Sequence, residues 1–240
     1  SLDVIGYAPG FERFGGANDS AFQTALGLAR QADVVILWLG LDELAETEGM
    51  DRTDMSIRPC QAALLEALSR ENSNIVVVLS GGAPVETPWI VHCKSLIHGY
   101  LGGQAGAGAM ADLLTGKAVP SGKLAESWPV RLEDTPCSRY YPGREKTAEY
   151  REGIYVGYRY YDTTGKTVRF PFGFGLSYTS FSYSDLEVSG TAAVFRITNT
   201  GSVPGAEIAQ LYVSPENPAV FRPVRELKGF AKVFLQPGES

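Results

Sequence analysis

Histidine and cysteine, which carry much of enzyme chemistry, are scarce in this sequence. Its 240 residues include two histidines, His92 and His98, and three cysteines, Cys60, Cys93 and Cys137. Two histidines cannot build a histidine-rich metal centre, and they leave little from which a Ser-His-Asp triad could be made. An odd number of widely spaced cysteines fits neither a disulfide framework nor the spacing of a zinc site. We therefore expect no metal ion and no cofactor.

Long apolar runs and an excess of positive charge are also missing. No run of about 18 apolar residues occurs, so no segment is expected to span a membrane. The first residues lack the basic stretch followed by an apolar one that marks a secretory signal, which leaves the cellular compartment open. The net charge is −6, whereas binding to phosphate backbones needs a basic face. Nucleic acid and membrane are therefore not expected as partners.

The first half of the sequence alternates between strand and helix patterns. Apolar residues make up 44% of the chain, which is enough for a sizeable core in one large or two modest domains. Apolar runs predict buried parallel strands, covered by helices on both faces, over 33–39, 75–79 and 95–100. A shorter strand is expected over 2–7. Helical spacing is seen over 20–31, from 59 onward and over 102–114. The alternation predicts a layered α/β sandwich with a mainly parallel sheet.

An acidic stretch, residues 39–55, follows the first buried strand directly, and we call it the acidic loop. It holds one cation, Arg52, and the carboxylates Asp42, Glu43, Glu46, Glu48, Asp51 and Asp54. Like charges so close together resist joint ionisation, so we expect a raised pKa for at least one carboxyl group. Such a group can hold a proton near neutral pH and deliver it to a leaving group. The loop falls beyond the carboxyl end of a strand, where α/β sheets bind ligands. A solvated acidic surface is the alternative.

Two other features of this half each allow two interpretations. Residues 106–111 follow a predicted strand and open a helix, as a dinucleotide-binding fingerprint does, and Glu126 lies about twenty residues further on. However, Pro120 and Gly122 interrupt the segment between them, and glycines can instead let a helix pack closely on a sheet. His98, near the end of a predicted strand, could be a base, but we favour a hydrogen-bonded structural histidine.

The pattern changes after residue 120, where prolines break the periodicity. Seven tyrosines crowd residues 140–161 and predict that this segment packs on a neighbouring surface, with stacking on sugar rings as the alternative. From residue 177 the pattern is typical of strands, including 193–198 and 208–213, with turns between them. It predicts an all-β immunoglobulin-like sandwich. Only about four or five strands fit before residue 240, so the sandwich is expected to be incomplete.

Several runs of residues resemble landmarks of glycoside hydrolase family 3 β-glucosidases, and they occur in that family's order. They are residues 46–52, 102–104, 120–124, 128–129, 152–161 and 170–179. The resemblance implies a layered α/β sandwich followed by a fibronectin type III-like domain. We therefore expect an α/β sandwich domain over 1–133, a Tyr/Pro-rich linker over 134–176 and a partial fibronectin type III-like β-sandwich over 177–240.

The resemblance also implies a mechanism that uses two carboxyl groups. The family's retaining hydrolases combine an aspartate nucleophile with a glutamic acid/base. The nucleophile belongs to a separate barrel domain, within a Ser-Asp-Trp-like motif. This sequence contains no such motif, because the nearest string, residues 184–186, lacks the tryptophan. The acid/base belongs to the α/β sandwich, on the loop that residues 46–51 match.

Within the acidic loop, the resemblance favours Glu46 as the acid/base because of its distance before Gly49. Glu48 is the second candidate, since the spacing in this loop varies within the family, and an ordinary surface glutamate is the alternative for Glu46. We expect Asp51 and Arg52 to bind substrate. Arg52 could instead only hold the loop together, through Glu48 or Asp54. In addition, Ala45 stands where many relatives carry a large aromatic residue.

The expected function is that of part of a retaining β-glucosidase, which removes terminal non-reducing β-D-glucosyl residues from oligosaccharides or glycosides. Its expected partners are a β-glucoside substrate and the barrel domain of the same enzyme, and a homo-oligomer is compatible with the sequence. Three alternatives stay open. They are a β-xylosidase-type specificity, a non-catalytic carbohydrate-binding or scaffolding fragment, and a nucleotide-binding α/β domain with an attached β-sandwich.

Overall fold

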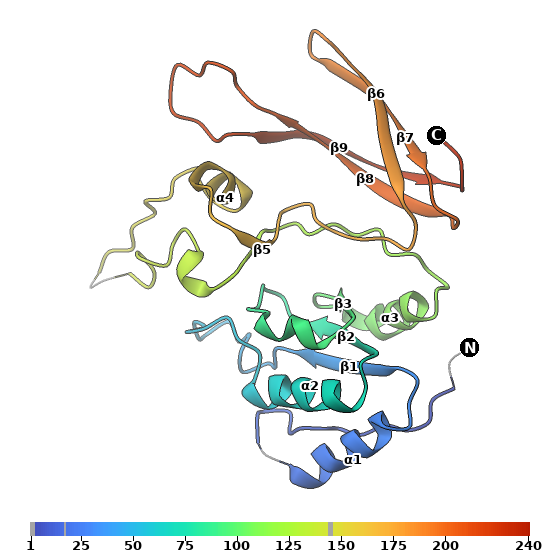
Figure 1. The fold of residues 1–240 in the computed structure, drawn as a ribbon. Helices are drawn as coiled ribbons and strands as arrows, with labels where there is room; N and C mark the ends of the chain where they lie inside the picture. Colours follow the sequence, from blue (N-terminus) through green and yellow to red (C-terminus); the bar gives the residue numbers. More distant parts are fainter. Residues whose placement is uncertain (1–2, 17, 144–145) are drawn as a thin grey trace. The chain divides into compact units, whose positions relative to one another are not determined.

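The computed structural model describes residues 3–16, 18–143 and 146–240 (Figure 1). These residues form two compact units. The first contains the described residues up to Ala111 together with Val130–Leu132. The second contains Asp112–Pro129 and the described residues from Glu133 onward.

The first unit is built on a parallel sheet with the strand order β1-β2-β3. The strands are β1 (Val35–Gly40), β2 (Ile75–Ser80) and β3 (Ser95–His98), and both pairings are parallel. The central position of β2 explains its continuous apolar sequence. Val77 and Val78 point to opposite faces of the sheet and are both buried. The structure thus confirms the predicted α/β fold with a mainly parallel sheet.

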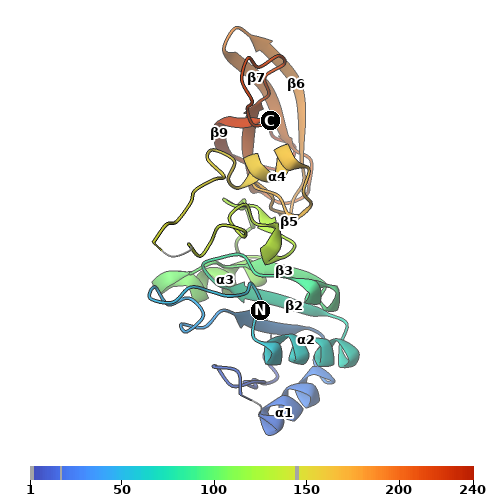
Figure 2. The same cartoon turned by 90° about the vertical axis from the view of Figure 1, so that its left-hand side faces the viewer.

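Two helices, α1 (Asp19–Ala29) and α2 (Pro59–Glu71), lie on one side of this sheet, with α2 next to the strands (Figures 1 and 2). Pro59 suits the first helical position, where no N–H donor is needed and the ring presets a helical φ. The face of α2 that turns inward is apolar and contains the buried side chains of Leu64, Leu65 and Leu68. Helical spacing therefore produced the expected core contact with the sheet.

The strand β1 lies at one edge of this sheet, and its two faces differ. Leu37 and Leu39 are buried, whereas Ile36 and Trp38 expose 36% and 49% of their surface. The prediction that helices cover both faces is therefore wrong for β1 within the described residues. The short strand expected over 2–7 is not formed by residues 3–7, and Leu2 lies outside the described residues.

The second unit consists mainly of β-hairpins. The strands β6 (Phe181–Ser189) and β7 (Ala192–Asn199) pair antiparallel, as do β8 (Gly205–Val213) and β9 (Glu226–Leu235). The predicted strands over 193–198 and 208–213 fall inside β7 and β8. The all-β character expected after residue 177 is thus confirmed.

The segment before these hairpins contains the antiparallel pair β4 (Trp128–Pro129) and β5 (Val168–Phe170) and the helix α4 (Tyr158–Thr164). Several of its tyrosines pack on neighbouring rings, as predicted, whereas Tyr150 is 83% exposed. The ring centroid of Tyr158 lies 5.0 Å from that of Phe172 and 5.7 Å from that of Tyr212. Aromatic packing therefore joins α4 to β8 inside the second unit.

A buried asparagine, Asn199, joins the ends of the two hairpins. Its side-chain N–H groups donate to the carbonyl oxygens of Val203 (2.9 Å) and Leu235 (3.0 Å). Its Oδ1 accepts hydrogen bonds from the Thr179 hydroxyl (2.7 Å) and from the N–H of Gly201 (3.1 Å). The amide is fully buried, so these partners replace water at every polar atom of the side chain.

Candidate active site in the acidic loop

The acidic loop leaves the carboxyl end of β1, where the sequence predicted it. Gly40, the last residue of β1, is tied to α2 because the Gln61 side chain hydrogen-bonds both its N–H and its C=O at 2.9 Å. A Cβ atom on Gly40 would lie 2.2 Å from the carbonyl oxygen of Ser80 in β2, so only glycine fits there. The start of the loop is therefore fixed by both β2 and α2.

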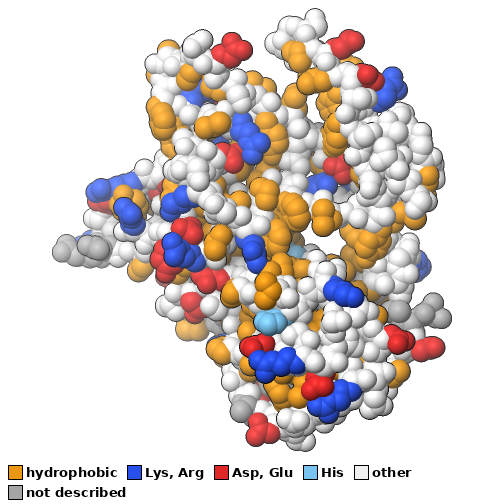
Figure 3. Space-filling model, viewed as in Figure 1, with side chains coloured by type: hydrophobic (Ala, Val, Ile, Leu, Met, Phe, Trp, Pro, Cys, Tyr) orange, Lys and Arg blue, Asp and Glu red, His pale blue; other side chains and the backbone are white. Residues whose placement is uncertain are grey.

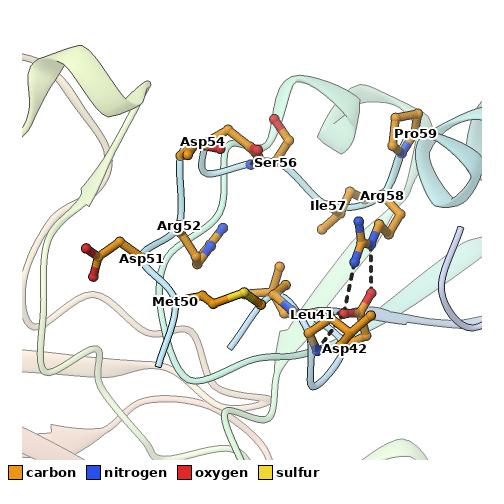
Figure 4. A pocket seen from close by; sticks show the side chains of 14 residues that line it. Leu41, Asp42, Met50, Asp51, Arg52, Asp54, Ser56, Ile57, Arg58 and Pro59 are labelled. Atoms are coloured by element: carbon orange, nitrogen blue, oxygen red, sulfur yellow. Dashed lines mark hydrogen bonds and ion pairs between the residues drawn. The ribbon is translucent and has the colours of Figure 1, made fainter. Parts of the chain in front are cut away.

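The Asp42 side chain, 4% exposed, organises the first turn of the loop (Figure 4). Its Oδ1 accepts the backbone N–H groups of Leu44 (3.0 Å) and Ala45 (2.9 Å). The Arg58 guanidinium donates to the same carboxylate, with Nε 2.7 Å from Oδ2 and Nη2 3.1 Å from Oδ1. The Arg58 bonds hold the pKa of Asp42 below its ordinary value, although burial alone would raise it.

The expectation that these carboxylates crowd around a single cation is wrong, because the fold brings two more arginines to the loop. Arg58 pairs with Asp42, and Arg13 pairs with Glu43 at 2.9 Å between exposed side chains. The pKa of Asp42 is consequently lowered, whereas crowding alone predicted a raised carboxyl pKa in this loop. Arg13 lies 30 residues before Glu43, and Arg58 lies three residues past the end of the loop.

Glu46 is partly buried and anchored, whereas Glu48 is exposed. The Oε1 of Glu46 accepts the N–H of Gly82 at 2.7 Å, and Gly82 belongs to the loop that follows β2. A Cβ atom on Gly82 would lie 3.2 Å both from this oxygen and from Cδ1 of Leu101. Glu48 has no hydrogen bond or ion pair in the part of the chain that the structure describes. The structure thus positions the first candidate acid/base and leaves the second in solvent.

Arg52 lies in the wall of a pocket of about 420 Å³ formed mainly by the acidic loop (Figure 4). Its guanidinium points toward the interior of the pocket, while the Asp51 carboxylate points away. One guanidinium nitrogen, Nη2, is buried and has no hydrogen-bond partner among the described residues. In the same residues Arg52 makes no ion pair with Glu48 or Asp54, so the alternative that it holds the loop through them is not seen. A guanidinium in a pocket wall that keeps an unsatisfied N–H suits a ligand that presents oxygen atoms.

The described residues contain no group of three or more His, Cys, Asp or Glu side chains that could hold a metal ion. Nor does any helix in the described ranges have the length and apolar character needed to cross a membrane. On the face seen in Figure 3, basic and acidic side chains are interspersed.

The glycine-rich segment 106–111 begins helix α3 (Gly106–Leu114), but its glycines do not provide the close helix packing that we considered. A Cβ atom on Gly106 or Gly108 would meet no atom within 4 Å. The tight approach lies just before the helix, where a Cβ atom on Gly102 would come within 2.7 Å of the Gly106 Cα. A glycine is therefore required at the turn rather than in the helix.

His98 is partly buried beside Tyr100, and the interpretation of it as a hydrogen-bonded structural histidine stays a prediction. Its ring centroid lies 4.0 Å from that of Tyr100. Burial lowers the pKa of His98, which keeps the imidazole neutral at physiological pH.

The sequence pattern did not point to Arg13, Arg58 or Gly82. For Gly82 a signal existed, because it follows β2 as the acidic loop follows β1, and parallel strands end at the same edge of a sheet. Arg58 directly precedes α2, and α2 packs on β1. The chain after the acidic loop therefore had to return close to the end of β1, where the loop begins. Nothing in the sequence indicated the pairing of Arg13 with Glu43.

Comparison with known families identifies the chain. Residues 9–158 match the glycosyl hydrolase family 3 C-terminal domain, and residues 207–240 match the fibronectin type III-like domain. The matched α/β region carries the acidic loop, and the second match falls on β8 and β9. The chain therefore belongs to glycosyl hydrolase family 3, as the sequence motifs predicted.

Individual relatives agree with this assignment. Thermostable beta-glucosidase B of Acetivibrio thermocellus is 49% identical over 233 residues, which cover 94% of this chain and 31% of that protein. An exo-alpha-(1->6)-L-arabinopyranosidase of Bifidobacterium breve is 45% identical over 241 residues, which cover 98% of this chain and 32% of that protein. The chain thus spans about a third of the length of these relatives.

Solved structures show the same likeness. A family 3 beta-glucosidase of Bifidobacterium adolescentis superposes with a TM-score of 0.94 at 46% identity, over 97% of this chain and 36% of that one. A beta-glucosidase of Kluyveromyces marxianus in complex with glucose superposes with a TM-score of 0.88 at 41% identity, over 93% of this chain and 28% of that one.

Proposed function

We propose that this chain supplies the general acid/base of a retaining β-glucosidase, whose aspartate nucleophile lies on a barrel domain outside these 240 residues. The observation that carries the proposal is the acidic loop of a family 3 chain, held at the carboxyl end of a parallel strand with Glu46 anchored at 2.7 Å to the Gly82 N–H. The names of the similar β-glucosidases support the reaction.

The proposed reaction has two steps. First, the barrel aspartate attacks the anomeric carbon while Glu46 gives its proton to the glycosidic oxygen, so that the bond between carbon and oxygen breaks. Then Glu46 takes a proton from a water molecule that attacks the same carbon, and this step releases glucose and restores the aspartate. Because Oε1 of Glu46 accepts the Gly82 N–H, its Oε2 is the oxygen available to carry the proton.

Glu48 is the alternative acid/base, and one observation favours it. Its exposed side chain has no partner in the described chain and is free to meet a substrate, whereas the carboxylate of Glu46 is already engaged by Gly82. Both assignments keep the same chemistry and the same loop. They differ in which of two residues moves the proton, and kinetics can decide between them.

The deciding experiment compares Glu46→Ala and Glu48→Ala in the complete enzyme, that is, this chain together with its barrel domain. General acid/base catalysis contributes about 10²–10⁴-fold, and a poor leaving group needs it most. The acid/base variant should lose cellobiose hydrolysis far more than hydrolysis of dinitrophenyl β-glucoside, and azide should restore turnover and yield β-glucosyl azide. If azide restores turnover only in the Glu48 variant, the acid/base is Glu48 and not Glu46. Near-normal cellobiose activity in both variants would refute the proposal.

We further propose that Asp51 and Arg52 contribute to substrate binding. The support is Arg52, whose side chain lines the pocket of about 420 Å³ and whose buried Nη2 lacks a partner among the described residues. A sugar hydroxyl could accept this hydrogen bond. Asp51 is exposed and points away from Arg52, so it would meet a ligand from a different side.

The preferred sugar is a separate question, because a similar protein is named an exo-alpha-(1->6)-L-arabinopyranosidase. A β-D-xyloside and an α-L-arabinopyranoside both lack the hydroxymethyl group of glucose. Comparing kcat/KM of the complete enzyme for p-nitrophenyl β-D-glucoside, β-D-xyloside and α-L-arabinopyranoside tests the choice. We expect the glucoside to be the best substrate.

A further inference from the structure

The acidic loop is closed at its base by the pair of Asp42 and Arg58. These residues are 16 positions apart, with Asp42 near the start of the loop and Arg58 three residues beyond its end. Both nitrogens of the bidentate contact lie within 3.1 Å of a carboxylate oxygen. The chain between them contains no helix or strand of its own, although it carries both candidate acid/base residues. Its conformation therefore depends on the few side chains that tie it down.

Burial distinguishes this pair from the other ion pair of the loop. The Asp42 side chain is 4% exposed and that of Arg58 is 36% exposed, whereas Arg13 and Glu43 are 72% and 55% exposed. Exposed pairs between flexible side chains contribute little because water screens them. Asp42 also accepts the N–H groups of Leu44 and Ala45, the residues directly before Glu46. The backbone that leads to the first candidate is thus fixed to the exit of the loop.

We propose that Asp42 and Arg58 are positioning residues for the general acid/base, and this inference rests on the proposed function above. A general acid must lie within hydrogen-bond reach of the glycosidic oxygen. A displacement of a reacting group by about 1 Å can cost roughly 100-fold in rate. Because the pair fixes the loop and not one glutamate alone, the inference holds for Glu46 and for Glu48.

The substitution Asp42→Asn separates the two tasks of this side chain. An asparagine keeps an oxygen that can accept the N–H groups of Leu44 and Ala45, but it loses the charge that pairs with Arg58. Arg58→Met removes the guanidinium from the other side and keeps an unbranched stem. Glu43→Gln and Arg13→Met are the matched controls, since they break an exposed pair that involves the same loop.

In the complete enzyme we expect Asp42→Asn and Arg58→Met to lower kcat/KM for cellobiose by about 10- to 100-fold. The first step with dinitrophenyl β-glucoside should change by less than about 3-fold, because its leaving group hardly needs a proton. The double variant should lose little more than either single variant, since both break the same contact. The controls should stay within about 2-fold of the parent for both substrates.

A merely structural role predicts a different result, namely an equal loss for both substrates that follows a smaller folded fraction. That outcome, or unchanged cellobiose kinetics in both variants, would overturn the inference.

Amide hydrogen exchange of the 240-residue chain gives a second readout, because residues 43–57 should exchange faster in Asp42→Asn while β2 stays protected. If Glu46→Ala and Glu48→Ala behave as proposed but Asp42→Asn does not, only this inference fails. If neither glutamate variant is impaired, the proposed function itself fails.

Discussion

At the scale of single residues, Gly82 decides where the Glu46 side chain can lie. Its N–H holds the carboxylate, and a methyl group in place of its hydrogen would lie 3.2 Å from Oε1. Gly82→Ala should therefore push the Glu46 carboxylate aside and lower kcat/KM of the complete enzyme for cellobiose by about 10-fold or more. Steady-state kinetics on cellobiose and dinitrophenyl β-glucoside would measure this, and the loss should be larger for cellobiose.

Gly49→Ala is the matched control for this prediction. Gly49 lies in the same loop, and a Cβ atom there would meet no atom within 4 Å. The control should leave cellobiose hydrolysis unchanged. Equal effects of the two substitutions would indicate that Glu46 is not the acid/base and would favour Glu48.

The ion pair of Asp42 also predicts how stability depends on pH. Hydrogen bonds from Arg58 lower the pKa of Asp42 in the folded state. Asp54 and Cys60 also interact electrostatically with Arg58. The pair therefore stabilises the fold fully above the ordinary aspartate pKa of about 3.9, and this contribution is lost as the pH falls through the lowered value. Urea unfolding of the parent and of Asp42→Asn should differ by a constant amount between about pH 5 and 7. The difference should shrink below about pH 4, and a difference that persists at lower pH would contradict the assignment.

At the scale of elements, Asn199 is the link between the two hairpins of the second unit. Asn199→Ala would leave the carbonyl oxygens of Val203 and Leu235 without their buried donor. A buried polar group without a partner costs about 1–3 kcal/mol, so the free energy of unfolding should fall by at least that range. Urea midpoints would show it. Thr200→Ala, at the exposed neighbouring position, should change the midpoint little.

The burial of a strand was predicted correctly for β2 but not for β1, although both have apolar sequences. The apolar run of β2 predicted a strand buried on both faces, and the structure confirms it with Val77 and Val78. The same kind of run in β1 predicted the same burial, yet Trp38 is exposed. An apolar run shows that a strand is suited to burial. Whether both of its faces are buried depends on its position in the sheet, which is set by contacts between segments that are distant in the sequence.

At the scale of the whole molecule, the chain carries one half of the proposed catalytic pair. Its 240 residues contain no Ser-Asp-Trp motif for a nucleophile, and it spans about a third of the length of similar β-glucosidases. One carboxyl group can donate a proton but cannot form the glycosyl-enzyme intermediate. We therefore expect the purified chain alone to release no measurable p-nitrophenol from p-nitrophenyl β-glucoside. Robust release of p-nitrophenol under conditions where the complete enzyme is active would refute the proposal that the nucleophile lies on a separate barrel domain.

Much of the candidate site could be predicted from the sequence. Glu46, Glu48, Asp51 and Arg52 lie in the loop at the carboxyl end of β1, as expected from the strand before them and the motif around them. The electrostatics of that loop could not be predicted, because two of its carboxylates pair with arginines that lie outside residues 39–55. Arg58 and Arg13 reach Asp42 and Glu43 through the fold, and the bonds from Arg58 lower the pKa of Asp42, whereas crowding alone predicted a raised pKa for at least one carboxyl of the loop.

The sequence alone is enough to assign the family, to predict the strands β1 to β3 and the helices α1 to α3, and to place the acidic loop along the chain. These depend on local periodicity and on short motifs, which are read one segment at a time. Only the tertiary structure decided that the loop is closed by Asp42 and Arg58, that Glu46 binds the Gly82 N–H, and that Arg52 keeps a buried nitrogen without a partner among the described residues. Hydrogen bonds and charge pairs act over a few ångströms in space, and the chain separates their partners by between 16 and 36 residues in these contacts.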